Sequence, residues 1–151
     1  MKRFAFRLER LLGLRAATER EEARVFGAKA RAAEEAGRRA AAGSALEREA
    51  ARQAASARGI PTPAGAIANL GIAVDLAATE RARSATAQAE ADTEREHARL
   101  NYQTARIERR VLERLKDVRH ADWNVEASRE DRRAMDEIAL RSRPNLEGNR
   151  P

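Results

Sequence analysis

The prolines of this chain constrain its fold more than any other feature of the sequence. Two of them form a pair at Pro61 and Pro63, and the other two lie at Pro144 and Pro151. Proline cannot continue a helix, whereas apolar or small residues recur at steps of three and four on both sides of the pair, as in an amphipathic helix. Gly59 strengthens the break, because glycine favours helix ends. We therefore expect three elements, which are a helix over about 4–57, a turn over about 58–63 and a helix over about 64–142.

Composition favours a pair of long helices over an ordinary globular core. Charged residues make up 36 % of the chain and aromatic residues only 3 %. A helical hairpin tolerates this shortage of large apolar side chains, since each helix buries only one stripe. We predict an all-α fold, a long antiparallel two-helix coiled coil whose second helix is the longer. It forms a single helical domain over residues 1–143, followed by a disordered tail over 144–151.

A turn centred near residue 61 predicts which positions of the two helices face each other. Opposite residue numbers then sum to about 122. The pairs that this register places together are mostly apolar, namely Phe4 with Val118, Leu8 with Arg114 and Leu115, Leu11 with Val111, and Leu46 with Leu76. The expected seam of the first helix is mostly alanine, and includes Ala33 and Ala40. That of the second helix is expected to be strongest at Leu100, Ile107, Val111, Leu115 and Val118.

The same register leaves the end of the second helix, residues 119–142, without a partner in the first helix. This end carries large apolar side chains, which are Trp123, Val125, Met135, Ile138 and Leu140. A helix that exposes such residues usually binds another protein. The alternative is that the end folds back or self-associates.

The sequence offers no recognisable site for catalysis, a metal or a cofactor. It contains no cysteine, and its two histidines, His97 and His120, have no ligand cluster around them. No Gly-Lys-Ser/Thr follows the glycines near the break, so a phosphate-binding loop is not expected. The longest uncharged run, over 59–74, contains two prolines and three glycines and would be a poor membrane span. We expect a cytoplasmic protein that is not an enzyme.

The net charge of +6 is concentrated in two short segments. Residues 1–15 carry +4 and residues 106–119 carry +3, and a hairpin would bring them to the same end. Such a local field attracts an acidic partner, and the arginines that we expect to bind it are Arg7, Arg10, Arg110 and Arg114. The alternatives are a solvated helical face, binding to nucleic acid, or contact of residues 2–15 with a membrane surface.

Three segments resemble the flagellar type III export protein FliJ family and its injectisome central-stalk relatives. They are FAFRLERLLGLR at 4–15, RRVLERLKDVRHADW at 109–123 and DRRAMDEIALR at 131–141. Met135-Asp136-Glu137 is the most specific part of the closing segment, and the Gly59-Ile60 break lies where members of the family turn. Total length and helix order also agree, so the resemblance spans nearly the whole chain.

The resemblance implies a non-catalytic export component that is cytoplasmic and peripherally associated with the inner-membrane export apparatus. Its hairpin would be similar to the shaft of a rotary ATPase, insert its terminal end into the hexameric flagellar export ATPase, contact the export gate membrane protein and escort export chaperones. The side chains expected at the ATPase end are Arg7, Arg10, Arg110, Arg114, Trp123, Met135, Asp136 and Glu137. Those expected to face the gate are Ile72, Leu76, Thr79 and Arg83. The remaining alternative is a generic coiled-coil adaptor or a basic nucleic-acid-binding helical protein.

Overall fold

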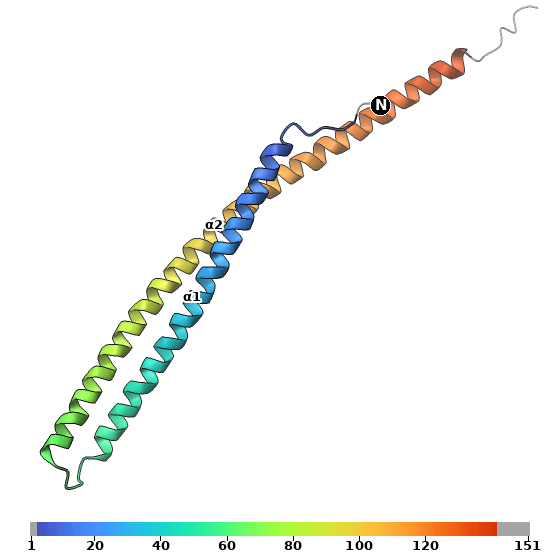
Figure 1. The fold of residues 1–151 in the computed structure, drawn as a ribbon. Helices are drawn as coiled ribbons and strands as arrows, with labels where there is room; N and C mark the ends of the chain where they lie inside the picture. Colours follow the sequence, from blue (N-terminus) through green and yellow to red (C-terminus); the bar gives the residue numbers. More distant parts are fainter. Residues whose placement is uncertain (1–2, 142–151) are drawn as a thin grey trace, which may run out of the picture. The chain divides into compact units, whose positions relative to one another are not determined.

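The chain folds into two α-helices joined by a short turn. The computed structural model describes residues 3–141, in which α1 spans Glu9–Ser56 and α2 spans Ala64–Arg141. The two helices pack against each other as a hairpin, and α2 is the longer (Figure 1), which confirms the predicted all-α fold. The predicted tail over 144–151 lies outside the described residues, as does residue 142 at the expected end of the second helix.

The turn lies where the glycine and the prolines predicted it. Gly59 has a φ of 88°, in the left-handed region that side chains with a Cβ rarely adopt. The carbonyl oxygen of Pro63 accepts hydrogen bonds from the N–H groups of Ala66 and Ile67, at 2.9 and 3.2 Å. Pro63 therefore precedes the first turn of α2, a place where its missing N–H group costs nothing.

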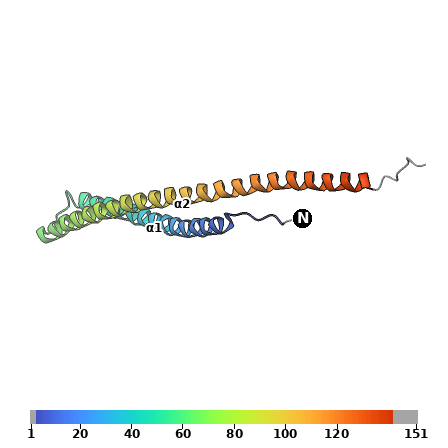
Figure 2. The same cartoon turned by 90° about the horizontal axis from the view of Figure 1, so that it is seen from above.

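The first helix begins later than the sequence predicted, at Glu9 rather than near Phe4. The N–H group of Glu9 donates to the carbonyl oxygen of Phe6 at 3.1 Å, and residues 3–6 are not helical. Figure 2 shows this segment lying beside the orange part of α2. The Phe4 ring there packs edge-on against the ring of His120, with centroids 4.8 Å apart. This aromatic contact replaces the helical turn that periodicity alone predicted.

Close contacts divide the chain into two compact units, which we describe separately. The hairpin unit, Ala17–Arg106, contains the turn and the parts of both helices next to it. The terminal unit combines Met1–Ala16 with Ile107–Pro151, of which residues 3–16 and 107–141 are described. The prediction of a single domain over 1–143 stays a prediction.

Small residues form the seam between the helices of the hairpin unit. The buried positions are Ala33, Ala40 and Gly43 on α1, and Ala77, Ser84, Ala98 and Ala105 on α2. Those of α2 are separated by seven residues or a multiple of seven, the heptad spacing of a coiled coil. Between the two helices, the rings of Phe26 and Tyr102 stack at 6.1 Å with an interplanar angle of 4°. The predicted alanine seam of the first helix is therefore confirmed at Ala33 and Ala40.

The register differs from the predicted one. Lys29 pairs with Glu94 and Arg81 pairs with Glu47, and together with the stacked rings these contacts join residue numbers that sum to 123–128 rather than 122. Leu46 and Leu76, expected to face each other in the core, are 55 % and 64 % exposed. Their immediate neighbours Glu47 and Ala77 take the seam positions instead, because alanine lets the helices approach closely.

Gly43 marks a close approach of α1 to α2 in the hairpin unit. A Cβ atom at Gly43 would lie 2.8 Å from Ser84 Oγ and 3.4 Å from Arg81 Cα. We expect Gly43→Val to lower the free energy of unfolding by about 1–3 kcal/mol, the usual cost of overpacking a tight interface. Gly13→Val is the matched control, because a Cβ at Gly13 meets nothing within 4 Å. Urea denaturation followed by circular dichroism measures both, and equal effects of the two substitutions would contradict a tight seam at Gly43.

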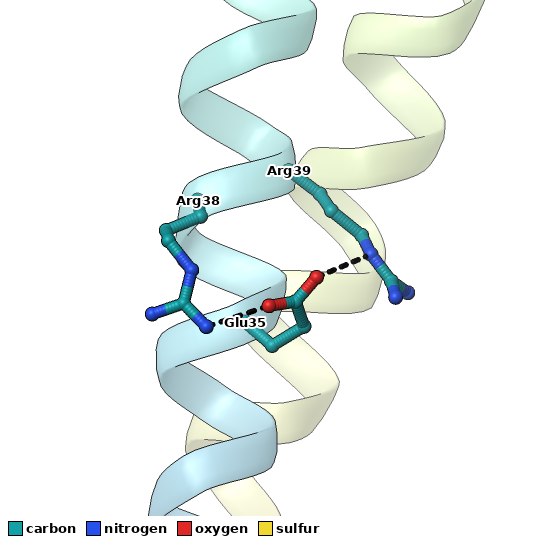
Figure 3. Close-up of polar contacts among 3 residues, drawn as sticks. All are labelled: Glu35, Arg38 and Arg39. Atoms are coloured by element: carbon teal, nitrogen blue, oxygen red, sulfur yellow. Dashed lines mark hydrogen bonds and ion pairs between the residues drawn. The ribbon is translucent and has the colours of Figure 1, made fainter.

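Several carboxylates of the hairpin unit form ion pairs within a helix or between the two helices. Glu35 accepts a hydrogen bond from Arg38 Nη2 at 2.6 Å and another from Arg39 Nε at 3.1 Å (Figure 3). The hydrogen bond from Arg38, followed by the positive charges of Arg38 and Arg39, holds the pKa of Glu35 below its ordinary value of 4.5. Hydrogen-bonded neighbours lower the pKa of four further carboxyl groups in this unit, which are Glu21, Glu49, Glu94 and Glu96.

These lowered pKa values predict that the helices weaken in acid. A carboxyl group whose pKa is depressed in the folded state stabilises that state fully above its unfolded value of 4.5. The stabilisation is then lost as the pH falls through the depressed folded value. We expect the melting temperature to fall as the pH is lowered below about 4.5, and Glu35→Gln to make this fall shallower. Glu34→Gln is the control at a neighbouring exposed residue, and an equally shallow profile for it would contradict the assignment to Glu35.

Candidate partner-binding surfaces

In the described part of the terminal unit, two carboxylates form ion pairs between α1 and α2. Glu9 of α1 accepts from Lys116 Nζ at 2.8 Å, and Glu108 of α2 pairs with Arg15 at 2.8 Å. Of the other two carboxylates in these segments, Glu113 pairs with Arg109 at 2.6 Å along α2, and Asp117 is exposed. The two basic segments of the sequence therefore come together, as the hairpin predicted, with Glu9, Glu108 and Glu113 already engaged.

The arginines predicted to bind the ATPase lie in this unit with their charges available. Arg7, Arg10, Arg110 and Arg114 are all exposed, and none forms an ion pair with a described residue. An exposed guanidinium that forms no ion pair can attract an approaching anion, although Asp117, three residues after Arg114, offsets part of the field. Their part in binding stays a prediction, which the geometry makes physically reasonable.

Trp123 has a partner within the chain, which corrects the expectation that α2 is unpartnered from residue 119 onward. Its ring stacks near His120, with centroids 6.2 Å apart, and lies 6.1 Å from the ring of Phe4. The heptad spacing could have revealed this contact, because Trp123 follows Lys116 by seven residues and so continues the face that meets α1. Trp123 is half-buried and thus offers a partner only part of its ring.

Beyond Trp123 the second helix becomes open to solvent. Every residue over 128–141 is exposed, including Asp136 and Glu137 of the closing motif. Met135, Ile138 and Leu140 are 68 %, 61 % and 69 % exposed. The structure therefore leaves these apolar side chains accessible to another protein, as the sequence predicted for the end of α2.

The four residues predicted to face the export gate lie on the exposed side of α2 in the hairpin unit. Ile72 and Leu76 are 58 % and 64 % exposed, and Arg83 is exposed as well. The hydroxyl group of Thr79 donates to the carbonyl oxygen of Asp75 at 2.8 Å, so it is engaged within the helix. Steps of four, three and four residues place all four side chains on one helical face. The alternative that Leu76 is core against Leu46 is wrong.

Two further surfaces were missed by sequence reasoning. An apolar groove of about 320 Å³ lies beside the turn, where Ala54, Ile60, Ile67 and Leu70 are among its lining residues. The second surface lies in the terminal unit, where Ile107, Val111 and Val118 were expected to pack against α1. These three side chains are 62 %, 61 % and 48 % exposed. Leu112 and Lys116 face α1 in their place, since both are half-buried and Lys116 pairs with Glu9.

No cluster of three or more potential metal ligands occurs among residues 3–141. Over the same residues, neither helix contains an apolar stretch of the length that crossing a bilayer requires.

The family model of the flagellar FliJ protein matches residues 4–144, nearly the whole chain. The chain therefore belongs to the FliJ family. Membership confirms the resemblance to this family and makes this protein a non-enzymatic component of the flagellar export apparatus. No curated protein and no solved structure matches it. Which proteins this member of the FliJ family contacts must therefore be argued from its own surface.

Proposed function

We propose that this protein is a coiled-coil stalk that engages the hexameric flagellar export ATPase through its terminal unit. One observation carries the proposal. Arg7, Arg10, Arg110 and Arg114 are exposed without ion pairs to described residues, while the carboxylates Glu9 and Glu108 beside them are used in pairs between the helices. An acidic ring would recognise such an end by long-range attraction and orient it before contact.

The exposed end of α2 supplies the apolar part of the same proposed interface. Met135 and Ile138 can bury their side chains against a partner, and Asp136 can hydrogen-bond to it, as can Glu137, which already accepts a hydrogen bond from Arg141 at 2.5 Å. Trp123 contributes only its accessible edge, since Phe4 and His120 cover part of the ring. Attraction from the arginines and apolar contact from the helix end would thus act together.

The second proposed contact is with the export gate membrane protein, through Ile72, Leu76, Thr79 and Arg83 on α2 of the hairpin unit. Two exposed aliphatic side chains, followed by a guanidinium that forms no ion pair with a described residue, suit a surface with both apolar and acidic groups. Such contacts would hold the protein in the cytoplasm, peripherally at the inner membrane. The same stalk would escort export chaperones to the apparatus.

Co-purification with the export ATPase tests the proposal directly. The protein is mixed with the purified hexameric ATPase, and the complex is isolated by size exclusion at low and at high salt. We expect a complex at low salt that weakens as salt rises, because exposed charges are screened over about 8 Å at physiological ionic strength. Absence of a complex at low salt would reject the proposal. Tight binding to duplex DNA under the same conditions would favour the nucleic-acid alternative.

A further inference from the structure

The face of α2 that points away from α1 in the terminal unit carries a row of aliphatic side chains. We call Ile107, Val111 and Val118 the outer stripe, and they are 62 %, 61 % and 48 % exposed. At 100° per residue they lie within about 40° of one another around the helix, and about 140° from Leu112 and Lys116, which face α1. Three exposed aliphatic side chains on one solvent-facing side of a helix, with Arg114 between Val111 and Val118, form a surface of the kind that binds another molecule.

Two arginine side chains lie along one side of the outer stripe. Arg110 and Arg114 lie about 20–60° from it around the helix, both on the same side, and are four residues apart. Neither forms an ion pair with a described residue, whereas Glu108 and Glu113 nearby pair with other arginines. Asp117 lies on the same side of the helix, about 20° beyond Arg110, so the edge of the outer stripe is basic because its two arginines outnumber one carboxylate.

We propose that the outer stripe, with Arg110 and Arg114, binds an amphipathic helix whose apolar face is edged by carboxylates. Carboxylates at steps of three and four on such a helix would meet the two guanidiniums, while its aliphatic residues cover Val111 and Val118. The surface goes beyond ATPase engagement by the terminal unit, although Arg110 and Arg114 contribute to both.

The arrangement of charge argues for this occupant over a second copy of the chain. Two antiparallel copies related by a two-fold axis across the outer stripe would bring the same edge of each together. Arg110 and Arg114 of one copy would then approach those of the other, and like charges oppose association. A helix with acidic edges removes this repulsion and uses the same apolar area.

A synthetic peptide provides the probe. It spans about three heptads, with leucines on one face and glutamates at the flanking positions, and a second peptide carries lysines in place of the glutamates. Binding to the full chain is measured by fluorescence anisotropy. We expect the glutamate peptide to bind more tightly than the lysine peptide. Val111→Gln with Val118→Gln should weaken its binding about tenfold. Arg110→Gln with Arg114→Gln should reduce both its affinity and the dependence of that affinity on salt.

The control variant combines Leu46→Gln with Arg48→Gln, an exposed leucine and arginine on α1 of the hairpin unit. It should bind the glutamate peptide as the wild type does. Equal binding of the two peptides, or equal losses in the outer-stripe and control variants, would overturn the proposal. So would a wild-type dimer in sedimentation that Val111→Gln with Val118→Gln converts to a monomer, because a second copy would then cover the stripe.

The two proposals fail separately in these measurements. If the glutamate peptide does not bind while the hexameric ATPase still co-purifies, only the outer-stripe proposal is rejected. If the peptide binds and the ATPase does not, only the proposed function is rejected. Circular dichroism of each variant confirms that the helices are intact, as expected for substitutions at exposed positions.

Discussion

Reversing the arginines of the terminal unit to glutamate is expected to abolish binding to the export ATPase and to leave the helices intact. Arg7, Arg10, Arg110 and Arg114 are exposed and form no ion pairs with described residues, so folding loses little when they change. Reversing all four takes the net charge from +6 to −2 and turns attraction for an acidic ring into repulsion. Size exclusion with the hexameric ATPase measures the loss, and circular dichroism measures helix content.

A matched control separates the position of the charge from its amount. Arg31 and Arg48 are exposed on α1 of the hairpin unit, and their reversal changes the net charge as much as reversal of Arg110 and Arg114. We expect the Arg110 and Arg114 variant to lose binding at low salt, and the Arg31 and Arg48 variant to retain most of it. Equal losses would mean that net charge alone governs association. Full retention by the Arg110 and Arg114 variant would remove these residues from the interface.

The break at the turn and the small residues of α1 could be predicted because local chemistry decides them. Gly59 and Pro63 act on the backbone directly, and the structure has a positive φ at one and the start of a helix after the other. Ala33 and Ala40 lie in a stretch that offers few larger apolar residues, so no other face competed for the seam. In such stretches the helical period allows only one face of the helix to form the seam.

The face that α2 turns toward α1 could not be predicted from hydrophobicity. Leu100 and Ile107 rank above Ala98 and Ala105 as apolar residues, yet they are 47 % and 62 % exposed while the alanines are buried. At the closest part of the seam even a Cβ at Gly43 would lie 2.8 Å from Ser84 Oγ, which leaves no room there for a large aliphatic side chain. Packing geometry therefore overrides apolar strength, and the excess aliphatic residues are left on the outside of α2.

The free arginines also could not be identified from sequence spacing. Glu113 could pair with Arg109 or with Arg110 at helical distance, and only the fold shows that it pairs with Arg109. Glu9 could likewise have neutralised a neighbour on α1, but it reaches across to Lys116. Which arginines are left to bind a partner thus depends on which carboxylates already form ion pairs within the fold. The pairing of these carboxylates is set by the tertiary structure, and so is the contact of Phe4 with Trp123.

Truncating the chain after Ser128 is expected to leave its melting temperature nearly unchanged and to abolish binding to the export ATPase. Every residue over 129–141 is exposed, so removing this part of α2 uncovers no core. A helical segment of this length is marginal in water by itself, so it adds little to folding. Met135, Ile138 and Leu140 nevertheless offer the partner its largest exposed aliphatic contacts in this segment.

A second truncation, after Val118, separates residues that stabilise the fold from residues that only bind the partner. It also removes His120 and Trp123, which pack on Phe4, so it should lower the melting temperature where the shorter deletion does not. The deleted residues 129–151 hold six arginines and five carboxylates, so the net charge falls only from +6 to +5, and the loss of binding should persist at low salt, unlike a loss caused by charge reversal. Intact ATPase binding after truncation at Ser128 would leave Met135-Asp136-Glu137 without a role in this contact. A large fall in melting temperature would show instead that these residues stabilise the folded chain.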